Sequence, residues 1–500
     1  MTENKRNPVI WRYYLIAELT NVSPLLIGSG DDDLADAQCI RSGDERLFIP
    51  GTTVAGRLRE FAESALQDAE FVTRAFGRAD GRQSLLTFLD APLVDDGGGQ
   101  TTVRDSVRLN EEGKTAADQG KFDYETVDPG QRFCFEIHAI LRDSDRADME
   151  RMRQLLAALR AALENGEISF GAKTNRGLGR MKAADFKEKV FDFSSTLEER
   201  KKAGRNWLDW KSQPKAERIY DSCQPVQPAA RCANDHIRIE ARFELTGSLL
   251  IRSYSADPAA PDVTPVAVPG EKGEEGIPVI PGTSWAGVLH HSLLSLKREL
   301  QGDRGERMDV ILEKLFPPVK TKTDSDADKI LHASNLIIDE SRVENAQMVD
   351  YTRNAIDRFT GGVVNGRLFT ERLVMQKEKE KAIVTFSSRV RRKLYEPRAR
   401  HHDLLLSFSS RVRRKLYGEK NEQLSENCAA ALLLALLDIG NGIAPVGGAA
   451  SVGRGILRLI SLKKDGEEMV RREDDIVRPN DAMNTVVKKL ADYLRGGEEQ

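Results

Sequence analysis

The chain has 500 residues, 40% of them hydrophobic and 31% charged, and its 75 Lys and Arg nearly balance its 78 Asp and Glu, for a net charge of -3. This length predicts about two to four domains. The charge balance excludes a uniformly basic, histone-like chain but leaves room for local basic grooves.

Membrane and disulfide classes are not expected. No segment reaches the roughly 20 apolar residues of a membrane span, and the N-terminus lacks the hydrophobic region of a signal peptide. The longest apolar run, 428–437, predicts a buried helix. Five cysteines form no CxxC pair, which disfavours a disulfide framework or structural zinc. We expect a soluble, cytoplasmic protein.

Four patterns follow one another in the first half of the chain. A strand and turn at 17–29 come first. At 48–61, a Pro-Gly break leads into a helix. Two strands joined by a Gly-bearing turn are predicted at 107–127. A glycine-rich segment at 168–182 then leads into another strand.

The same patterns recur in the same order in the second half. They lie at 243–253, 279–292, 354–374 and 445–459. The sharpest match is FIPGTTVAGRLREF with VIPGTSWAGVLHHS. We interpret the chain as an internal duplication of one supersecondary unit.

This duplication predicts the domain organisation. We expect a first domain at 1–195, a charged, Pro-containing linker at 196–235, a second domain at 236–463 and a charged tail at 464–500. The second domain carries a surplus near 375–420 with 14 Lys or Arg against 5 Asp or Glu. That surplus is an insertion without a role, a charged arm or a nucleic-acid clamp, and the sequence leaves these open.

The Pro-Gly turns predict anion sites. The hydroxyl residues that follow can cap a helix, and a helix N-terminus attracts phosphate. The alternative is an ordinary strand-turn-helix connection, which two matched copies disfavour. The hydroxyl residues and the basic residues that add charge in the first half are Thr52, Thr53, Thr283, Ser284, Arg57 and Arg59.

The glycine-rich segment GAKTNRGLGR is neither a P-loop nor a dinucleotide fingerprint. Its backbone N–H groups, with Lys173, Arg176 and Arg180, fit a loop that lies along a polyanion. A tight-packing role for the glycines is the alternative.

An acidic run, Asp31 to Asp33 with Asp36, follows the first strand. It is either a divalent-cation site or a solvated loop. No HExxH or G-x-S-x-G pattern supports a metallohydrolase or serine hydrolase.

Together, IPGTT-x-x-G-R-L-R, the late glycine segment and the hairpin NAIDRFTGG with its ERLV return resemble the RAMP superfamily. More narrowly, they resemble backbone subunits of type III CRISPR effector complexes, and a tandem fusion resembles type III-D. The resemblance implies an α+β chain with two ferredoxin-like (RRM-type βαββαβ) domains, each with an inserted thumb hairpin.

The resemblance also implies a function. The family's catalytic Asp falls at Asp36 and, less securely, at Asp262. Either carboxylate would take a proton or hold Mg²⁺ while a 2′-hydroxyl cleaves target RNA. Arg353 and Arg358 flank the second thumb and would contact RNA. The partners implied are guide RNA, single-stranded target RNA and other effector subunits.

Other functions remain to be weighed. The chain would be an RNA-guided endoribonuclease with two sites or, alternatively, a scaffold of the same complex that cuts at one site or none. A guide-processing nuclease is disfavoured because no His lies near the first-half motifs. A nucleotide cyclase rests on the short match GSGDD alone.

Overall fold

The computed structural model describes the chain in ranges separated by gaps. These are 7–28, 37–66, 68–77, 83–94, 98–109, 116–223, 236–253, 260–270, 276–317, 334–378, 380–392, 421–473 and 476–496. Contacts divide the chain into two compact units. Unit 1 comprises 1–104, 122–174 and 178–233, and unit 2 comprises 105–121, 175–177 and 234–500.

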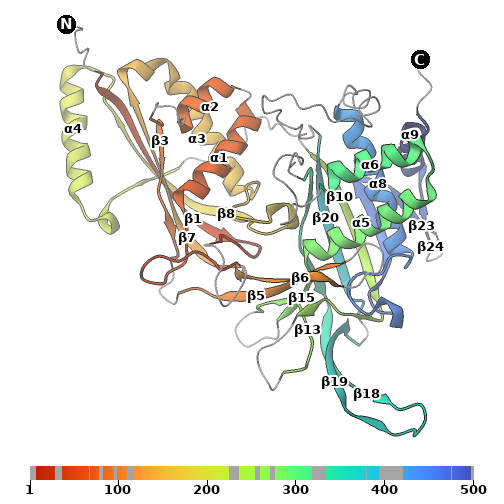
Figure 1. Cartoon of the computed structure of the whole chain (residues 1–500). Coiled ribbons are helices and arrows are strands. Elements are labelled where there is room, and N and C mark those ends of the chain that lie inside the picture. Colours follow the sequence, from red (N-terminus) through yellow and green to blue (C-terminus); the bar gives the residue numbers. More distant parts are fainter. Residues whose placement is uncertain are drawn as a thin grey trace. The chain divides into compact units, whose positions relative to one another are not determined.

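The centre of unit 1 is an antiparallel sheet (Figure 1). Its long strand β1 (Val9–Asn21) lies between β7 (Arg132–Arg142) and β8 (Met181–Asp192). The edge strands are β3 (Leu86–Phe88) and β9 (Asp221–Ser222), giving the order β3-β7-β1-β8-β9. The four strands β3, β7, β1 and β8 thus have the order of the sheet in a ferredoxin-like domain.

Three helices bury one face of this sheet (Figure 1). Val54, Leu58 and Ala62 recur every four residues in the first helix and form its buried stripe. Because side chains alternate along β1, Trp11 and Leu15 point into the same core. The helices are α1 (Gly51–Leu66), α2 (Ala69–Phe76) and α3 (Met149–Glu164).

The other face of the unit 1 sheet is covered by α4 (Leu197–Ser212) (Figure 1). Thr196 and Glu199 form a capping box at its start. Trp210 packs against Tyr14 and Phe191 of the sheet. Residues 196–222, expected from sequence to belong to a linker with some helix, therefore include a helix and the strand β9 that pack on unit 1.

Unit 2 repeats this arrangement. Its strands β10 (His236–Thr246), β16 (Leu336–Ile338), β20 (Ile383–Arg391) and β21 (Ile456–Lys464) have the order β16-β20-β10-β21, which corresponds to β3-β7-β1-β8. The core is closed by α5 (Gly282–Glu299), α6 (Asp303–Leu315), α8 (Asn421–Gly440) and α9 (Asp481–Arg495). Both units are consistent with the predicted tandem ferredoxin-like fold.

The helix α8 is the predicted apolar helix. It is the one helix of the described part of the chain that is long and apolar enough to cross a membrane, and 72% of that stretch is buried inside the protein. Its residues from Cys428 to Leu433 are all buried in the unit 2 core. Its composition thus reflects burial against the sheet.

The chain also carries two long hairpins, of which the first has its base in unit 1 and its residues 105–121 assigned to unit 2. The first is β5 (Thr101–Leu109) with β6 (Ala116–Val127), and the second is β18 (Ala346–Ile356) with β19 (Val363–Gln376), which extends away from the unit 2 sheet (Figure 1). The remaining short strands are β2 (Phe48–Ile49), β4 (Ala91–Pro92), β11 (Ser248–Leu249), β12 (Arg252–Ser253), β13 (Thr264–Pro265), β14 (Ala267–Val268), β15 (Ile277–Ile280), β17 (Ser341–Glu344), β22 (Glu467–Glu468), β23 (Val470–Glu473) and β24 (Ile476–Pro479).

Candidate functional site

The glycine-rich segments of the two units have the same backbone geometry. Gly171 and Gly447 have φ angles of +83° and +89°. A Cβ atom would lie 2.2 Å from the Leu26 carbonyl oxygen at the first position and 2.6 Å from the Leu250 carbonyl oxygen at the second. Only glycine fits there. These glycines therefore serve close packing of the loop on its own unit, as the alternative interpretation expected.

Lys173 does not point freely into solvent. Its Nζ atom lies 3.4 Å from the ring centroid of Tyr124 and 4.5 Å from that of Phe122. This ammonium is enclosed and has no hydrogen-bond partner among the described residues. Burial lowers the pKa of Lys173 to about 8. Lys173 is thus a cation stacked on the rings of β6.

Asp36, the first candidate catalytic residue, falls in 29–36, outside the described residues. The chain directly after it is well defined. Ala37 forms a parallel bridge with Tyr124, and the Glu125 N–H donates to the Ala37 carbonyl over 2.9 Å. The residue after Asp36 is therefore fixed to the base of the β5–β6 hairpin.

Asp262, the second candidate, has an equivalent place in unit 2. The next residue, Val263, forms a parallel bridge with Glu371 of the hairpin strand β19. Asp262 is exposed, and its Oδ2 atom accepts a hydrogen bond of 2.7 Å from the Thr370 N–H. One carboxylate oxygen is thereby anchored to the hairpin, which fixes the orientation of the side chain.

The neighbouring registers support this equivalence. Leu25 bridges Val127 in unit 1, and Leu249 pairs with Val374 in unit 2. Counting back three residues from each partner gives Tyr124 in unit 1 and Glu371 in unit 2. Both candidate aspartates thus directly precede a residue that is bridged to the return strand of a hairpin.

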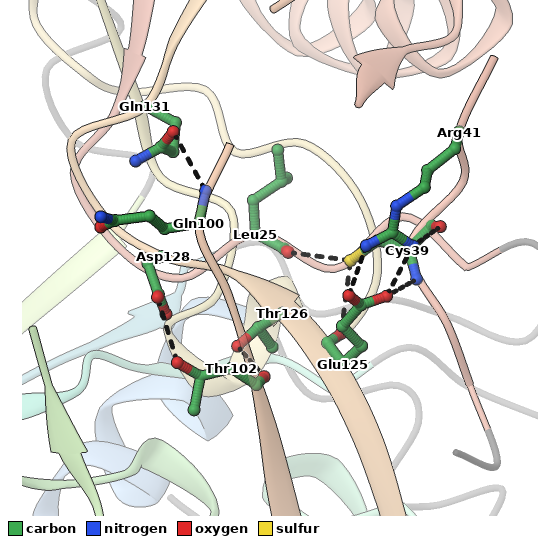
Figure 2. A network of polar contacts seen from close by, with 9 residues as sticks. All are labelled: Leu25, Cys39, Arg41, Gln100, Thr102, Glu125, Thr126, Asp128 and Gln131. Carbon is green, nitrogen blue, oxygen red and sulfur yellow. Dashed lines mark hydrogen bonds and ion pairs between the residues drawn. The ribbon is translucent and has the colours of Figure 1, made fainter. Parts of the chain in front are cut away.

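A buried carboxylate holds the unit 1 loop in place (Figure 2). Glu125 accepts hydrogen bonds from both terminal nitrogens of Arg41, at 3.0 and 2.6 Å, and from the Cys39 N–H at 2.9 Å. Burial raises the pKa of Glu125, but the bonds from Arg41, Thr101 and Cys39 outweigh it, and the pKa lies below its ordinary value. This ion pair clamps residues 37–41 to the hairpin base.

The polar contacts continue along the base of the same hairpin (Figure 2). Thr102 donates to Asp128 over 3.1 Å, and Thr126 donates to the Thr102 carbonyl over 3.2 Å. Burial raises the pKa of Asp128, which the bond from Thr102 opposes. These contacts tie β5 to the end of β6.

In unit 2 the residue that corresponds to Tyr124 is Glu371, and it forms a buried ion pair. Arg454, in the second glycine-rich segment, lies 2.6 Å from Glu371, and their exposed fractions are 2% and 4%. The Arg353 guanidinium lies 3.4 Å from the same carboxylate. The predicted RNA contact Arg353 is therefore already beside a carboxylate.

The first helices differ from the predicted anion sites in detail. The helices α1 and α5 begin at glycine, Gly51 and Gly282, so the hydroxyl residues that follow lie within the first turn and do not cap the helix. These residues are Thr52, Thr53, Thr283 and Ser284. The Gly51 N–H is bonded to Asp90 over 2.7 Å. One donor of the unit 1 helix terminus is thus occupied by a carboxylate.

The predicted phosphate contacts of α1 are also engaged. Arg57 pairs with Glu60 and donates to the Ser169 carbonyl over 2.7 Å. Arg59 pairs with Glu63 at 3.0 Å. Arg176 lies in a short 3₁₀ helix, Thr174–Arg176. An RNA phosphate would have to compete with Glu60 and Glu63 for these guanidinium groups.

The tip of the β18–β19 hairpin presents exposed groups. Asp357 accepts hydrogen bonds of 2.8 Å from the N–H groups of Phe359 and Thr360, and these bonds lower its pKa. The turn leaves the Phe359 side chain 97% exposed, and the predicted contact Arg358 is exposed beside it. Ile356 and Val363, which pair with each other near this tip, are exposed as well, and such a group of exposed apolar side chains marks a binding surface.

The described residues contain no group of three His, Cys, Asp or Glu that could hold a metal ion. Asp262 offers a single carboxylate, and its neighbour Glu371 is neutralised by Arg454. Mg²⁺ often binds proteins through one or two carboxylates plus substrate phosphates. The residue types therefore fit a Mg²⁺ ion bound by a protein carboxylate together with RNA phosphates.

Sequence reasoning did not identify the residues that surround the candidate aspartates. Glu125 and Glu371 each stand in a strand two residues before an apolar residue, Val127 or Leu373, and Arg454 lies between two glycines. A charged residue in such a setting signals a buried pair. That signal indicates burial but does not name the partner.

The fold and site define a class: two ferredoxin-like units in tandem, with two hairpins and with a glycine-rich loop packed against the segment that follows the first strand of each unit. A family model described as the RAMP superfamily matches residues 18–182 and 263–458. The chain belongs to the RAMP superfamily, and this membership indicates a CRISPR-associated RNA-binding subunit. No curated protein matches the chain.

Proposed function

We propose that the chain is the tandem-fused backbone subunit of a type III-D CRISPR effector complex. It binds guide RNA and the complementary target RNA in the cytoplasm and cleaves the target at two sites. The observation that supports this proposal is repeated in both units: the residue that follows each candidate Asp, Ala37 or Val263, is bridged to the base of a hairpin.

The β18–β19 hairpin suits a thumb that separates bases. Phe359 at its tip can insert between stacked bases. A shallow pocket of about 400 Å³ lies farther down the hairpin, lined by Arg353, Arg367 and Phe369 among others. Aromatic and guanidinium groups together suit a splayed nucleotide, whose base stacks while its phosphate is neutralised.

The chemistry proposed is attack by a target 2′-hydroxyl on the adjacent phosphate. The oxygen–phosphorus bond to the next nucleotide breaks, leaving a cyclic phosphate and a 5′-hydroxyl end. A splayed backbone aligns the attacking and leaving oxygens. One of the two roles tested below for Asp262, which Thr370 orients, is to accept the 2′-hydroxyl proton, while the leaving 5′-oxygen takes a proton from water. Asp36 would have the same role in unit 1.

Mg²⁺ is the proposed cofactor. Asp36 and Asp262 would each hold it together with RNA phosphates. When bound, such an ion stabilises the charge that develops on the phosphoryl oxygens. Whether each Asp acts as base or metal ligand is decided by the experiment below.

Guide binding is proposed to be independent of sequence. The protein contacts phosphates, while base pairing selects the target. The proposed contacts are Thr52, Thr53, Arg57, Arg59, Lys173, Arg176, Thr283, Ser284, Arg353 and Arg358. Of these, Arg358 is exposed on the hairpin tip and can reach RNA without releasing a protein partner that the structure records.

The test is cleavage of a labelled complementary RNA by the assembled complex. Wild type, Asp36→Ala and Asp262→Ala are compared in Mg²⁺ and in EDTA, with Asp209→Ala, an exposed position on α4, as the matched control. Each site variant should lose one product by about 10²–10⁴-fold while target binding persists. The control should cut normally.

The outcomes separate the roles. If EDTA abolishes cleavage and Mn²⁺ restores it in the conservative Asp262→Glu variant, the carboxylate is a metal ligand. Cleavage in EDTA that depends on Asp262 identifies a proton acceptor. Unchanged products in both Ala variants would show that this chain is a scaffold and that another subunit cuts.

A further inference from the structure

The strand β20 lies inside the unit 2 sheet, and its sequence occurs twice in the chain. FSSRVRRKLY stands at 386–395, where it supplies most of β20, and again at 408–417. The four residues before each copy also correspond, AIVT at 382–385 and LLLS at 404–407. The second copy lies outside the described residues. Because side chains alternate along a strand, both copies have the same sequence pattern of inward and outward residues.

The described contacts show what holds β20 in place. It pairs with β10 on one side and with β16 and β17 on the other. Its residues Val384, Phe386 and Val390 are buried in the unit 2 core, and the Phe386 ring lies 5.0 Å from the ring of Trp285. Backbone hydrogen bonds are the same for every residue except proline, so these side chains select the strand that fits.

The second copy would keep these contacts. It is identical to the first at every position of 386–395, so the buried Phe and Val of that stretch recur. Just after β20, Arg392 pairs with Glu426 of α8 at 3.0 Å and with Asp465 at 2.6 Å. Its counterpart Arg414 would find the same two carboxylates.

The connections along the chain allow the second copy to take this place. Because Arg392 contacts Glu426 in the second turn of α8, the end of β20 lies near the start of that helix. With the second copy in the sheet, residues 415–420 would join the strand to α8, and such a segment spans about 20 Å. The loop before the strand would lengthen from 377–381 to 377–403. The cost of closing a loop rises only slowly with its length, so neither connection opposes the exchange.

The four residues before the repeat decide which copy is favoured. Ala382 is fully buried, and Leu404 in its place would overfill the core. Ile383 and Val384 are β-branched and suit a strand, whereas leucines stand at the corresponding positions of the second copy. These differences favour the described pairing, but they are few beside the identical remainder. We therefore expect the second arrangement to be a minor state, about 0.1–10% populated.

We propose that 404–413 can replace 382–391 in the unit 2 sheet, in the same register against β10, so that unit 2 exchanges between two arrangements. Two packings that differ little in free energy can serve as a switch. The strand begins beside the hairpin base and ends beside α8. The exchange would therefore move 389–403, with six Lys or Arg against two Asp or Glu, from the α8 end of the sheet to the hairpin end. It does not require the proposed cleavage activity.

The test replaces a buried ring by a carboxylate in one copy, in the full chain. Phe386→Asp should expel the first copy, so that hydrogen exchange measured by mass spectrometry shows amide protection moving from 382–391 to 404–413. Unit 2 should stay folded, with an unfolding constant about 10–10³-fold larger than in wild type, the inverse of the minor population. Phe243→Asp, a matched change at a buried position of β10, affects a strand without a second copy and should unfold unit 2.

A second copy that has also been damaged should no longer rescue the sheet. Phe408→Asp alone should leave the stability of unit 2 at the wild-type level. The double variant, Phe386→Asp with Phe408→Asp, should unfold unit 2 as Phe243→Asp does. A single variant Phe386→Asp that is as unfolded as the double variant would overturn the proposal.

A further variant leaves β20 itself intact and so guards against misfolding. Leu404→Ala removes the overfilling from the second copy and should speed hydrogen exchange of the 382–391 amides several-fold, because these amides leave the sheet in the second arrangement. Unchanged exchange rates in this variant would contradict the proposal. Protection of 404–413 in Phe386→Asp that depends on protein concentration would contradict it too, because that result identifies a strand supplied by another chain.

Discussion

In both units the residue after the candidate aspartate, Ala37 or Val263, is bridged to the same point of a hairpin, but the side chains at that point differ. Beside the unit 1 site, Tyr124 and Lys173 form a cation–π stack. In unit 2, Glu371 stands in the place of Tyr124 and forms a buried ion pair with Arg454, whereas Ala449 stands in the place of Lys173.

This difference shows what a duplicated unit must keep. The loop backbone is retained because Gly171 and Gly447 approach the carbonyl groups of Leu26 and Leu250 too closely for any side chain. The side chains next to the aspartates are not bound by that constraint. The two sites should therefore respond differently to substitution and to pH.

The largest effect is expected at the ion pair. Arg454→Met leaves Glu371 buried with only the longer contact to Arg353. Breaking a buried pair on one side should lower the free energy of unfolding by about 3–5 kcal/mol, measured by urea unfolding followed by circular dichroism. The double variant Arg454→Met with Glu371→Leu should regain most of the loss. A single variant as stable as wild type would contradict the buried pair.

The clamp of unit 1 should be weaker and pH-dependent. Glu125→Gln removes the charge that holds Arg41 and should cost about 1–3 kcal/mol at pH 7. The folded pKa of Glu125 is lowered, so its contribution is present above the unfolded value of about 4.3 and is lost as pH falls through the folded value.

Unfolding curves of wild type and Glu125→Gln from pH 7 to pH 3 measure this dependence. The gap between the two proteins should narrow below about pH 4.3. A gap that stays constant over this range would mean that the Glu125 charge does not stabilise the loop.

These cases also show how far sequence reasoning reaches. The duplication, the helices after each Pro-Gly and the closing glycine loops were predictable because glycine and proline leave local signals. The packing of α4 was not, since 196–222 is highly charged and Tyr14, which both Trp207 and Trp210 contact, lies almost 200 residues away. Lys173 was predicted to contact phosphate from its glycine-rich setting. Its stacking on the ring of Tyr124 could not be predicted, because Tyr124 is distant in sequence.

Lys173 offers a smaller effect of opposite sign. Its folded pKa of about 8 lies below the unfolded value of about 10.4. The unfolded chain therefore binds the proton more readily, and stability should rise as pH increases from about 8 to 10.4.

At pH 7, the free energy of unfolding of Lys173→Met should exceed that of wild type by about 1 kcal/mol. This value allows for the partial solvent exposure of Lys173 and for the ring stack, both of which favour its charged form. This advantage should vanish near pH 10. Competitive acetylation measured by mass spectrometry, with exposed Lys182 as reference, should show a labelling midpoint near pH 8 for Lys173. A midpoint near 10.4 would contradict its burial.

The smallest effect concerns the backbone alone. Ala449 stands where unit 1 has Lys173, and their φ angles are +58° and +53°. Ala449→Gly should raise the free energy of unfolding by about 0.5–1 kcal/mol, which is measured as a small rise in the melting temperature. Lys173→Gly, the matched change, loses the ring stack and should gain less. Equal gains would mean that the stack contributes nothing.

The aromatic residues make the two units optically distinguishable. The sequence has four tryptophans, and Trp285 is the only one in unit 2. It is fully buried between Phe243 and Phe386, and its indole N–H donates to Ser341 over 3.0 Å. Its fluorescence should therefore be blue-shifted in the folded chain and report on unit 2. Subtracting the spectrum of a Trp285→Phe variant would let the unfolding of each half be followed in the intact protein.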